Sequence, residues 1–241
     1  NRVFLATMTY IPAVPKVLDL MKDAGLEVAA FDMIPVNPKI DTMERALAMA
    51  RDAKCGVFVG LGGGSSMDTA KTVALMMNNT APVWEYTLAM GDKMRPLEGE
   101  VPPIIAVPTT AGTGSEVSQG ASLTNPHTRQ KSPIRSAKIG PRHALIDPEL
   151  TVTLPRNLTA STGFEAFCLS FEKFLAAESF PFVDAMAEEA MRGVYRYLLK
   201  AMDDPKNLEA RSVMMWESTQ GGLCDLAGLG DAGPARRDEA R

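Results

Sequence analysis

A glycine-rich run over residues 60–64 stands where the chain could bind a phosphate group. It follows the apolar segment 56–59, which predicts a buried strand, and precedes apolar residues that share one helical face from Met67 to Met77. This order favours an anion site, because glycine lets the backbone approach the anion and the first N–H groups of a helix point toward it. We expect Ser65 or Ser66 to cap the helix. The alternative is a tight turn without a ligand, although three glycines in succession lose much conformational entropy on folding.

A second polar loop covers residues 108–116, again directly after an apolar segment. Its hydroxyl side chains suit ribose and phosphate oxygens and the edge of a planar ring; they are Thr109, Thr110, Thr113 and Ser115. Taken alone, the loop could equally be a polar turn that satisfies its own backbone. Two such loops at successive strand ends favour one shared crevice, since ligands of parallel sheets bind beyond the carboxyl ends of the strands.

The elements that would position these loops alternate between strand and helix. The predicted strands are 3–6, 28–31, 56–59 and 103–107, and the predicted helices are 17–24, 43–50 and the segment after Ser65. This rhythm predicts an α/β fold with a Rossmann-like, doubly wound, mostly parallel sheet. Residues 82–102 read as a loop, and residues 117–150 as short strands and turns.

The character of the chain changes after Pro155. Strand signals end, and three helices are predicted at about 159–176, 181–201 and 207–225. We therefore expect an α/β domain over residues 1–154 and a smaller all-helical domain over residues 155–241, the latter incomplete.

Composition limits the classes of function. The chain has 241 residues, a net charge of −4 and an acidic pI near 5.3, which argues against a nucleic-acid partner. It contains no apolar run of membrane-spanning length, so we expect no membrane partner. The three cysteines lack metal-ligand spacing and fit a reducing compartment, so we expect a cytoplasmic protein.

Two segments resemble the signatures of a known family. Gly-Gly-Gly-Ser-Ser-Met-Asp-Thr-Ala-Lys at 62–71 and Pro-Thr-Thr-Ala-Gly-Thr-Gly-Ser-Glu-Val-Ser at 108–118 resemble those of the iron-containing (group III) alcohol dehydrogenases. The resemblance continues through 147–151 and 160–163 and fades near 226–230. It covers most of the chain, and both signature segments are long and rare.

The resemblance implies a dinucleotide-binding domain, an all-helical domain and an active site in the cleft between them. It implies hydride transfer between NAD or NADP and a small alcohol or carbonyl substrate, in a homodimer. The cofactor-binding residues that it implies are Gly62, Gly63, Gly64, Ser65, Asp68, Thr109, Thr110, Thr113, Lys131 and Leu150. Catalytic residues remain unassigned.

The departures from the family pattern concern the ribose site and the metal site. Met8 stands where the family has an aspartate for the ribose 2′-hydroxyl, so NADP fits as well as NAD. For the divalent metal, iron or zinc, Glu165 stands at an aspartate position and Leu169 at the histidine position four residues later. Neither His127 nor His143 matches a ligand position. The metal is therefore in doubt, and the alternative is a catalytically silent nucleotide-binding homologue.

Overall fold

A parallel sheet forms the first part of the molecule in a computed structural model that describes residues 2–177 and 179–227. Its strands are β1 (Arg2–Ala6), β2 (Glu27–Phe31), β3 (Val57–Gly62), β4 (Ile104–Pro108) and β7 (His143–Ala144), in the order β2-β1-β3-β4-β7. Every neighbouring pair in this sheet is parallel. The Phe4 ring packs against those of Phe31 and Phe58 on the two neighbouring strands, β2 and β3, and all three rings belong to the main core.

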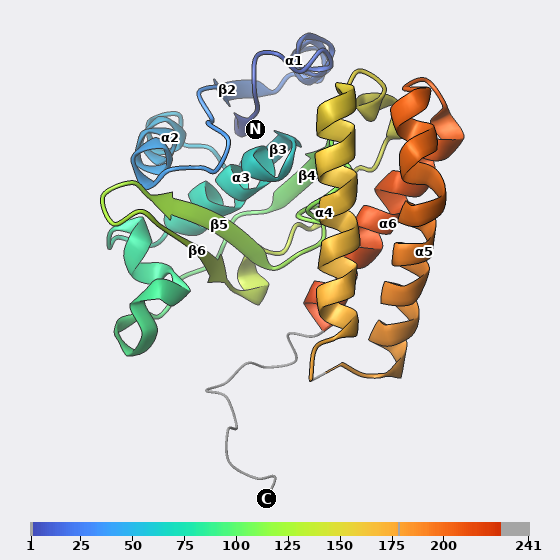
Figure 1. The fold of residues 1–241 in the computed structure, drawn as a ribbon. Helices are drawn as coiled ribbons and strands as arrows, with labels where there is room; N and C mark the ends of the chain where they lie inside the picture. The colour runs from blue at the N-terminus through green and yellow to red at the C-terminus, as the bar shows by residue number, and fades with distance from the viewer. Residues whose placement is uncertain (1, 178, 228–241) are drawn as a thin grey trace, which may run out of the picture.

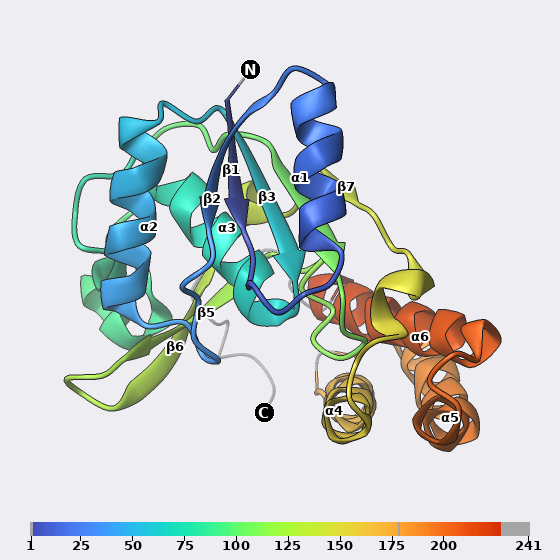
Figure 2. The same cartoon turned by 90° about the horizontal axis from the view of Figure 1, so that it is seen from above.

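The helices between these strands cover both faces of the sheet. Helix α1 (Val14–Asp23) lies on one side of strands β1–β3, and α2 (Ile40–Asp52) lies on the other side with α3 (Gly64–Met76), as Figure 2 shows. The chain leaves β1 toward β2 but leaves β3 toward β4, in the opposite direction. The carboxyl ends of β1 and β3 therefore form the switch point where doubly wound sheets bind ligands. The α/β fold class predicted from the sequence is confirmed.

Helix α3 differs from the expected one-sided helix because it is buried along most of its length. A two-stranded antiparallel hairpin, β5 (Gly120–Asn125) and β6 (Gln130–Arg135), covers the side that the sheet leaves open. Figure 1 shows this hairpin lying across α3. The hairpin falls in the region predicted only as short strands and turns, and 3-10 turns occupy part of the predicted loop 82–102, at Val83–Tyr86 and Leu88–Lys93.

Three long helices follow, and they pack on one another beside the sheet (Figure 1). They are α4 (Arg156–Phe174), α5 (Pro181–Asp203) and α6 (Leu208–Ala227), close to the predicted bounds. Gly163 allows this packing, because a Cβ there would lie 2.9 Å from the Met214 methyl group and still closer to Leu198. The domain boundary at residue 154 stays a prediction. The predicted polar tail 231–241 and the weak resemblance at 228–230 lie outside the described residues.

Within the described residues, we find no helix whose length and apolar character would let it cross a membrane.

Candidate active site

The glycine-rich turn between β3 and α3 is built by close packing. Gly60 brings the strand against the helix, because a Cβ there would lie 2.7 Å from Met67 Cα. Gly62 has a φ of +150°, a conformation that side chains disfavour, and a Cβ there would collide with Ser66. Gly63 is the N-cap of α3, with Gly64 as the first helical residue. The turn therefore places backbone N–H groups at a helix N-terminus, at the switch point of the sheet.

The predicted capping by serine is wrong. No side chain caps α3: Ser66 is fully buried with its hydroxyl unpaired among the described residues, and Ser65 is partly exposed. The hydroxyl of Thr7, directly after β1, is also buried and has no hydrogen-bond partner among the described residues. Among the described residues, the first N–H groups of α3 thus have no side-chain cap.

The second loop lies directly against the first. The Thr109 backbone N–H donates to the Gly62 carbonyl at 2.9 Å. A Cβ at Gly63 would lie 3.3 Å from Thr110 Oγ1, and one at Gly64 would lie 2.7 Å from Thr113 Cγ2. The two polar loops thus converge, as their positions at successive strand ends predicted.

Asp68 and Lys71, on the first turns of α3, hold the chain that follows the second loop. The Asp68 carboxylate accepts hydrogen bonds from Ser115 Oγ at 2.7 Å and from the Ser122 backbone N–H at 2.9 Å. Burial raises the pKa of Asp68, while the charge of Lys71 opposes this. Lys71 is a site residue that the sequence motifs alone do not reveal, but its helical spacing is a signal, because it falls on the same helical face as Met67, Ala70 and Ala74.

Two other predicted cofactor residues lie on separate elements. Lys131, on β6, is exposed, and its Nζ donates to Asn37 Oδ1 at 3.0 Å. Leu150 is partly buried in the short 3-10 turn Pro148–Thr151, which packs against α6. Their contact with a cofactor stays a prediction.

Helix α4 packs against the second loop, and its Glu165 faces that loop. A Cβ at Gly112 would lie 3.0 Å from Glu165 Oε2 and 2.8 Å from Thr162 Cβ, so the loop touches the helix at a position that needs glycine. Glu165 is exposed to solvent, but the loss of hydration where α4 meets the second loop raises the pKa of its carboxyl group; the charge of Lys131 lowers this pKa and that of Asp68 raises it further. Charges from α3 and β6 therefore act on this carboxyl group of α4.

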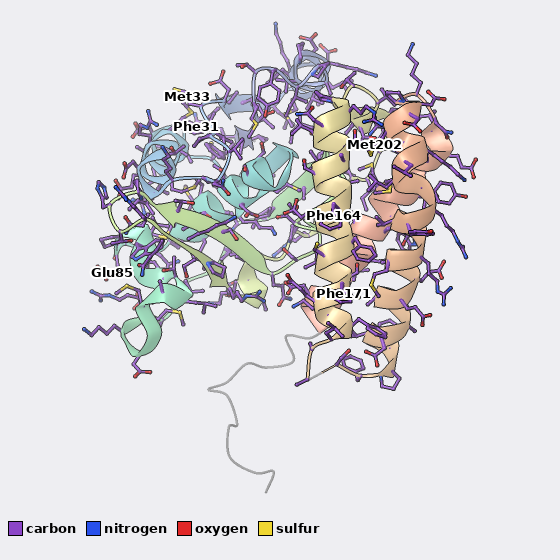
Figure 3. The ribbon with its side chains drawn as sticks, in the orientation of Figure 1. Phe31, Met33, Glu85, Phe164, Phe171 and Met202 are labelled. Atoms are coloured by element: carbon purple, nitrogen blue, oxygen red, sulfur yellow. The ribbon has the colours of Figure 1, made fainter. Side chains whose placement is uncertain are left out.

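A row of aromatic rings continues along α4. Phe164, Phe167 and Phe171 stack in sequence, with centroid distances of 6.1 and 6.2 Å, and Figure 3 shows Phe164 and Phe171 along this helix.

The described residues do not fit a divalent metal. Leu169, one helical turn after Glu165, packs against Gly221 of α6 and offers no ligand atom. His127 is exposed at the hairpin turn, 3.7 Å from Asp41, and His143 is exposed on β7. Over residues 2–177 and 179–227, no group of three or more His, Cys, Asp or Glu side chains could hold a metal ion. A catalytic zinc site usually has about three protein ligands.

At the position where the family pattern has its ribose aspartate, the chain that follows β1 carries Met8 and no carboxylate. Met8 is buried, forms an isolated bridge with Met33, and accepts a hydrogen bond from the Tyr10 hydroxyl at its Sδ. The structure therefore places a thioether and a phenol where the sequence departs from the family pattern.

Comparison with protein families gives two matches. The family described as "Iron-containing alcohol dehydrogenase" matches residues 1–148. The one described as "Fe-containing alcohol dehydrogenase family, C-terminal" matches residues 159–230.

Individual relatives agree with this. The chain is 36% identical to choline dehydrogenase of Bacillus subtilis over 207 residues, which cover 86% of this chain and 51% of that protein. It is 38% identical to 4-hydroxybutyrate dehydrogenase of Cupriavidus necator over 215 residues, covering 89% of this chain and 55% of that one. The structure of sulfoacetaldehyde reductase from Bifidobacterium kashiwanohense in complex with NAD+ superposes with a TM-score of 0.85 at 32% identity, covering 93% of this chain and 58% of that one. The chain thus spans about half the length of the curated relatives it matches.

Proposed function

Because the chain belongs to the iron-containing alcohol dehydrogenase family, we propose that it binds NAD or NADP and interconverts a small alcohol and its aldehyde or ketone. The observation that carries this proposal is the direct contact between the two polar loops at the N-terminus of α3. The matched relatives include dehydrogenases, and one similar structure holds NAD+.

In this proposal the cofactor pyrophosphate binds the backbone of Gly62, Gly63, Gly64 and Ser65, where no side chain caps the helix. Thr109, Thr110 and Thr113 line its adenine and nicotinamide portions, while Asp68 holds the loop that bears them. Lys131 contacts a ribose, and Leu150 packs near the nicotinamide. When bound, the nicotinamide ring supplies hydride transfer at its C4 atom.

The oxidation of an alcohol also releases the hydroxyl proton. Glu165 is the carboxyl group that α4 presents to the second loop, and its raised pKa suits a group that accepts and returns a proton. We therefore assign the substrate oxygen to the surface beside Glu165, where α4 meets the second loop. No step is assigned to a metal, because the described donor set does not fit one.

A second candidate function is suggested by the metal-ligand position that Leu169 occupies and by the absence of a three-ligand cluster among the described residues. It is a catalytically silent nucleotide-binding protein. Under either candidate we propose a cytoplasmic homodimer in which β2, an edge strand of the sheet, is paired.

The test compares two glycine substitutions by fluorescence titration with NADH and NADPH. Gly64→Ala places a Cβ 2.7 Å from Thr113 at the predicted pyrophosphate site, whereas Gly56→Ala places one in open space. We expect Gly64→Ala to weaken binding by about tenfold or more and Gly56→Ala to leave it unchanged. Equal affinity in the two variants would contradict the site.

Turnover then separates the two functions. The wild-type chain is assayed with short alcohols and aldehydes, after chelation and again with added Fe²⁺ or Zn²⁺. Hydride transfer under any of these conditions supports the dehydrogenase, and cofactor binding without transfer supports the silent homologue. Because the backbone is proposed to bind the pyrophosphate, chelation should leave the cofactor affinity unchanged.

A further inference from the structure

Lys71 is a fully buried cation in the middle of an otherwise mostly apolar helix face. Burying a charge is costly unless several partners compensate it. The hydrogen-bond partners of the Lys71 ammonium therefore show which part of the chain this side chain holds in place.

Among the described residues, the hydrogen bonds of the Lys71 ammonium all go to residues 115–120, which run from the end of the second loop to the first residue of the hairpin. Nζ lies 2.9 Å from Ser115 Oγ, 2.9 Å from the Ser118 carbonyl, 3.2 Å from Ser118 Oγ and 3.0 Å from the Gly120 carbonyl. An ammonium group has three donors, so these four acceptors engage it completely. Lys71 thus acts on the protein itself rather than on a ligand in the cleft.

Asp68 reinforces the same connection one turn earlier in α3. It accepts from Ser115 at one end of the segment and from Ser122, on β5, at the other. The segment 115–122 is therefore fixed to α3 at both ends. It carries the second loop on its N-terminal side and the hairpin with Lys131 on its C-terminal side.

The segment, and Gly114 directly before it, also contact the helical part of the molecule. Gly114 packs against Gly222, where a Cβ would lie 2.5 Å from Gly222 Cα, and Glu116 accepts a hydrogen bond from Thr219 at 2.8 Å. Three carboxyl groups face Lys71 from three elements and favour its charged form: Asp68 on α3, Glu116 on the segment and Asp225 on α6. Burial opposes them and lowers the pKa of Lys71 to about 8.

We propose that Lys71 is a positioning residue that, through segment 115–122, sets the two cofactor loops and the hairpin in the arrangement that binds the cofactor. This inference rests on the proposed function for its effect on affinity. It predicts that the loss of the Lys71 ammonium weakens cofactor binding although the side chain touches no cofactor.

The first experiment compares Lys71→Met with Arg51→Met. Arg51 also ties α3 to its surroundings, by donating to the Met76 and Asn79 carbonyls, but at the end of the helix far from the loops. We expect Lys71→Met to raise the Kd for NADH or NADPH by about tenfold or more, and Arg51→Met to change it by less than about twofold. Both variants should lose thermal stability, so stability alone does not distinguish them.

Amide hydrogen exchange provides a readout that needs no cofactor. Lys71→Met should speed exchange in residues 115–124 specifically, and Arg51→Met should not. Ser115→Ala is a milder variant that removes one Lys71 acceptor and one Asp68 donor without stranding a charge, and it decides the matter if Lys71→Met does not fold. It should weaken cofactor binding by about threefold or more.

The pH profile supplies a signature that a purely structural residue lacks. Wild-type affinity should fall as the pH rises through about 8, because a neutral amine has one donor fewer, and Lys71→Arg should remove this fall. Unchanged exchange in residues 115–124, or equal affinities for Lys71→Met and Arg51→Met, overturns the inference. If the wild-type chain binds neither cofactor, the proposed function fails, and the exchange result then decides the positioning role by itself.

Discussion

Glu217 offers the sharpest test of how burial controls this molecule. It lies on α6 with 5% of its surface exposed, accepts a hydrogen bond from Gln220, and fits against α5 only because Gly193 has no side chain. Burial raises the pKa of Glu217 from 4.5 to about 7; Gln220 opposes the shift and the charge of Glu189 adds to it. We predict that Glu217→Gln stabilises the protein at neutral pH.

The magnitude follows from proton linkage. Between pH 4.5 and 7 the folded state keeps a proton on Glu217 that the unfolded state has released, so wild-type stability falls as the pH rises through this window. A shift of about 2.5 pKa units corresponds to about 3 kcal/mol at about 1.36 kcal/mol per unit. Glutamine resembles the protonated carboxyl group and does not titrate, so the variant should match the wild type near pH 4.5 and exceed it by up to about 3 kcal/mol above pH 7.

Denaturant unfolding at several values between pH 4.5 and 8 measures this difference. In thermal unfolding at pH 7.5 it corresponds to a Tm increase of roughly 6–12 °C for a chain of this size. Glu188→Gln is the matched control, because Glu188 is exposed and its ion-pair partner within residues 2–177 and 179–227 is Arg192, one turn away; its removal should cost less than about 1 kcal/mol. A stability difference that stays flat across the window, or a Glu217→Gln protein less stable than wild type at pH 7.5, would refute the reasoning.

Two further predictions concern the contacts around the second loop. Gly114→Ala should destabilise the fold by about 1–3 kcal/mol more than Gly91→Ala, because both glycines have positive φ but only Gly114 packs against Gly222. Denaturant unfolding of the two variants checks this, and equal losses of unfolding free energy would exclude the contact. Lys131→Met should weaken NADH or NADPH binding by about three- to tenfold. The Tm should change little, because Lys131 is exposed and its only hydrogen-bond partner among the described residues is Asn37. A fluorescence titration beside a thermal scan checks this, and an unchanged Kd would remove Lys131 from the cofactor site.

The sequence predicts the sheet and the helices because their hydrophobic periods are strong and their loops carry clear stop signals. Gly25, for example, ends α1 with a φ of +73°, and its N–H and that of Leu26 close the last turn. The convergence of the two polar loops is predictable for the same reason, since both follow parallel strands. These features depend on short stretches of chain, where local pattern and tertiary structure agree.

Two kinds of feature are not predictable from the sequence: which residue of a turn takes the N-cap position, and contacts between distant segments. The expected serine cap does not form, because Gly63 takes the N-cap position and Ser66 is buried beneath the turn. The full burial of α3 could not be read from its own sequence, since the β5–β6 hairpin that covers it begins 44 residues after the end of α3. Lys71 belongs to the same class: its position on the apolar face signals burial, but its acceptors lie 44 to 49 residues away.

The site combines one half built by backbone packing with another half that depends on side-chain chemistry. Gly60, Gly62 and Gly64 fix the first half, because any side chain there would strike Met67, Ser66 or Thr113. The second half rests on α4, where Glu165 reaches the loop because Gly112 leaves room for it, and where Leu169 packs against Gly221 of α6. Cofactor binding and substrate chemistry should therefore respond to different substitutions. Changes at the glycines should act on cofactor affinity, and changes at Glu165 should act on turnover while the cofactor still binds.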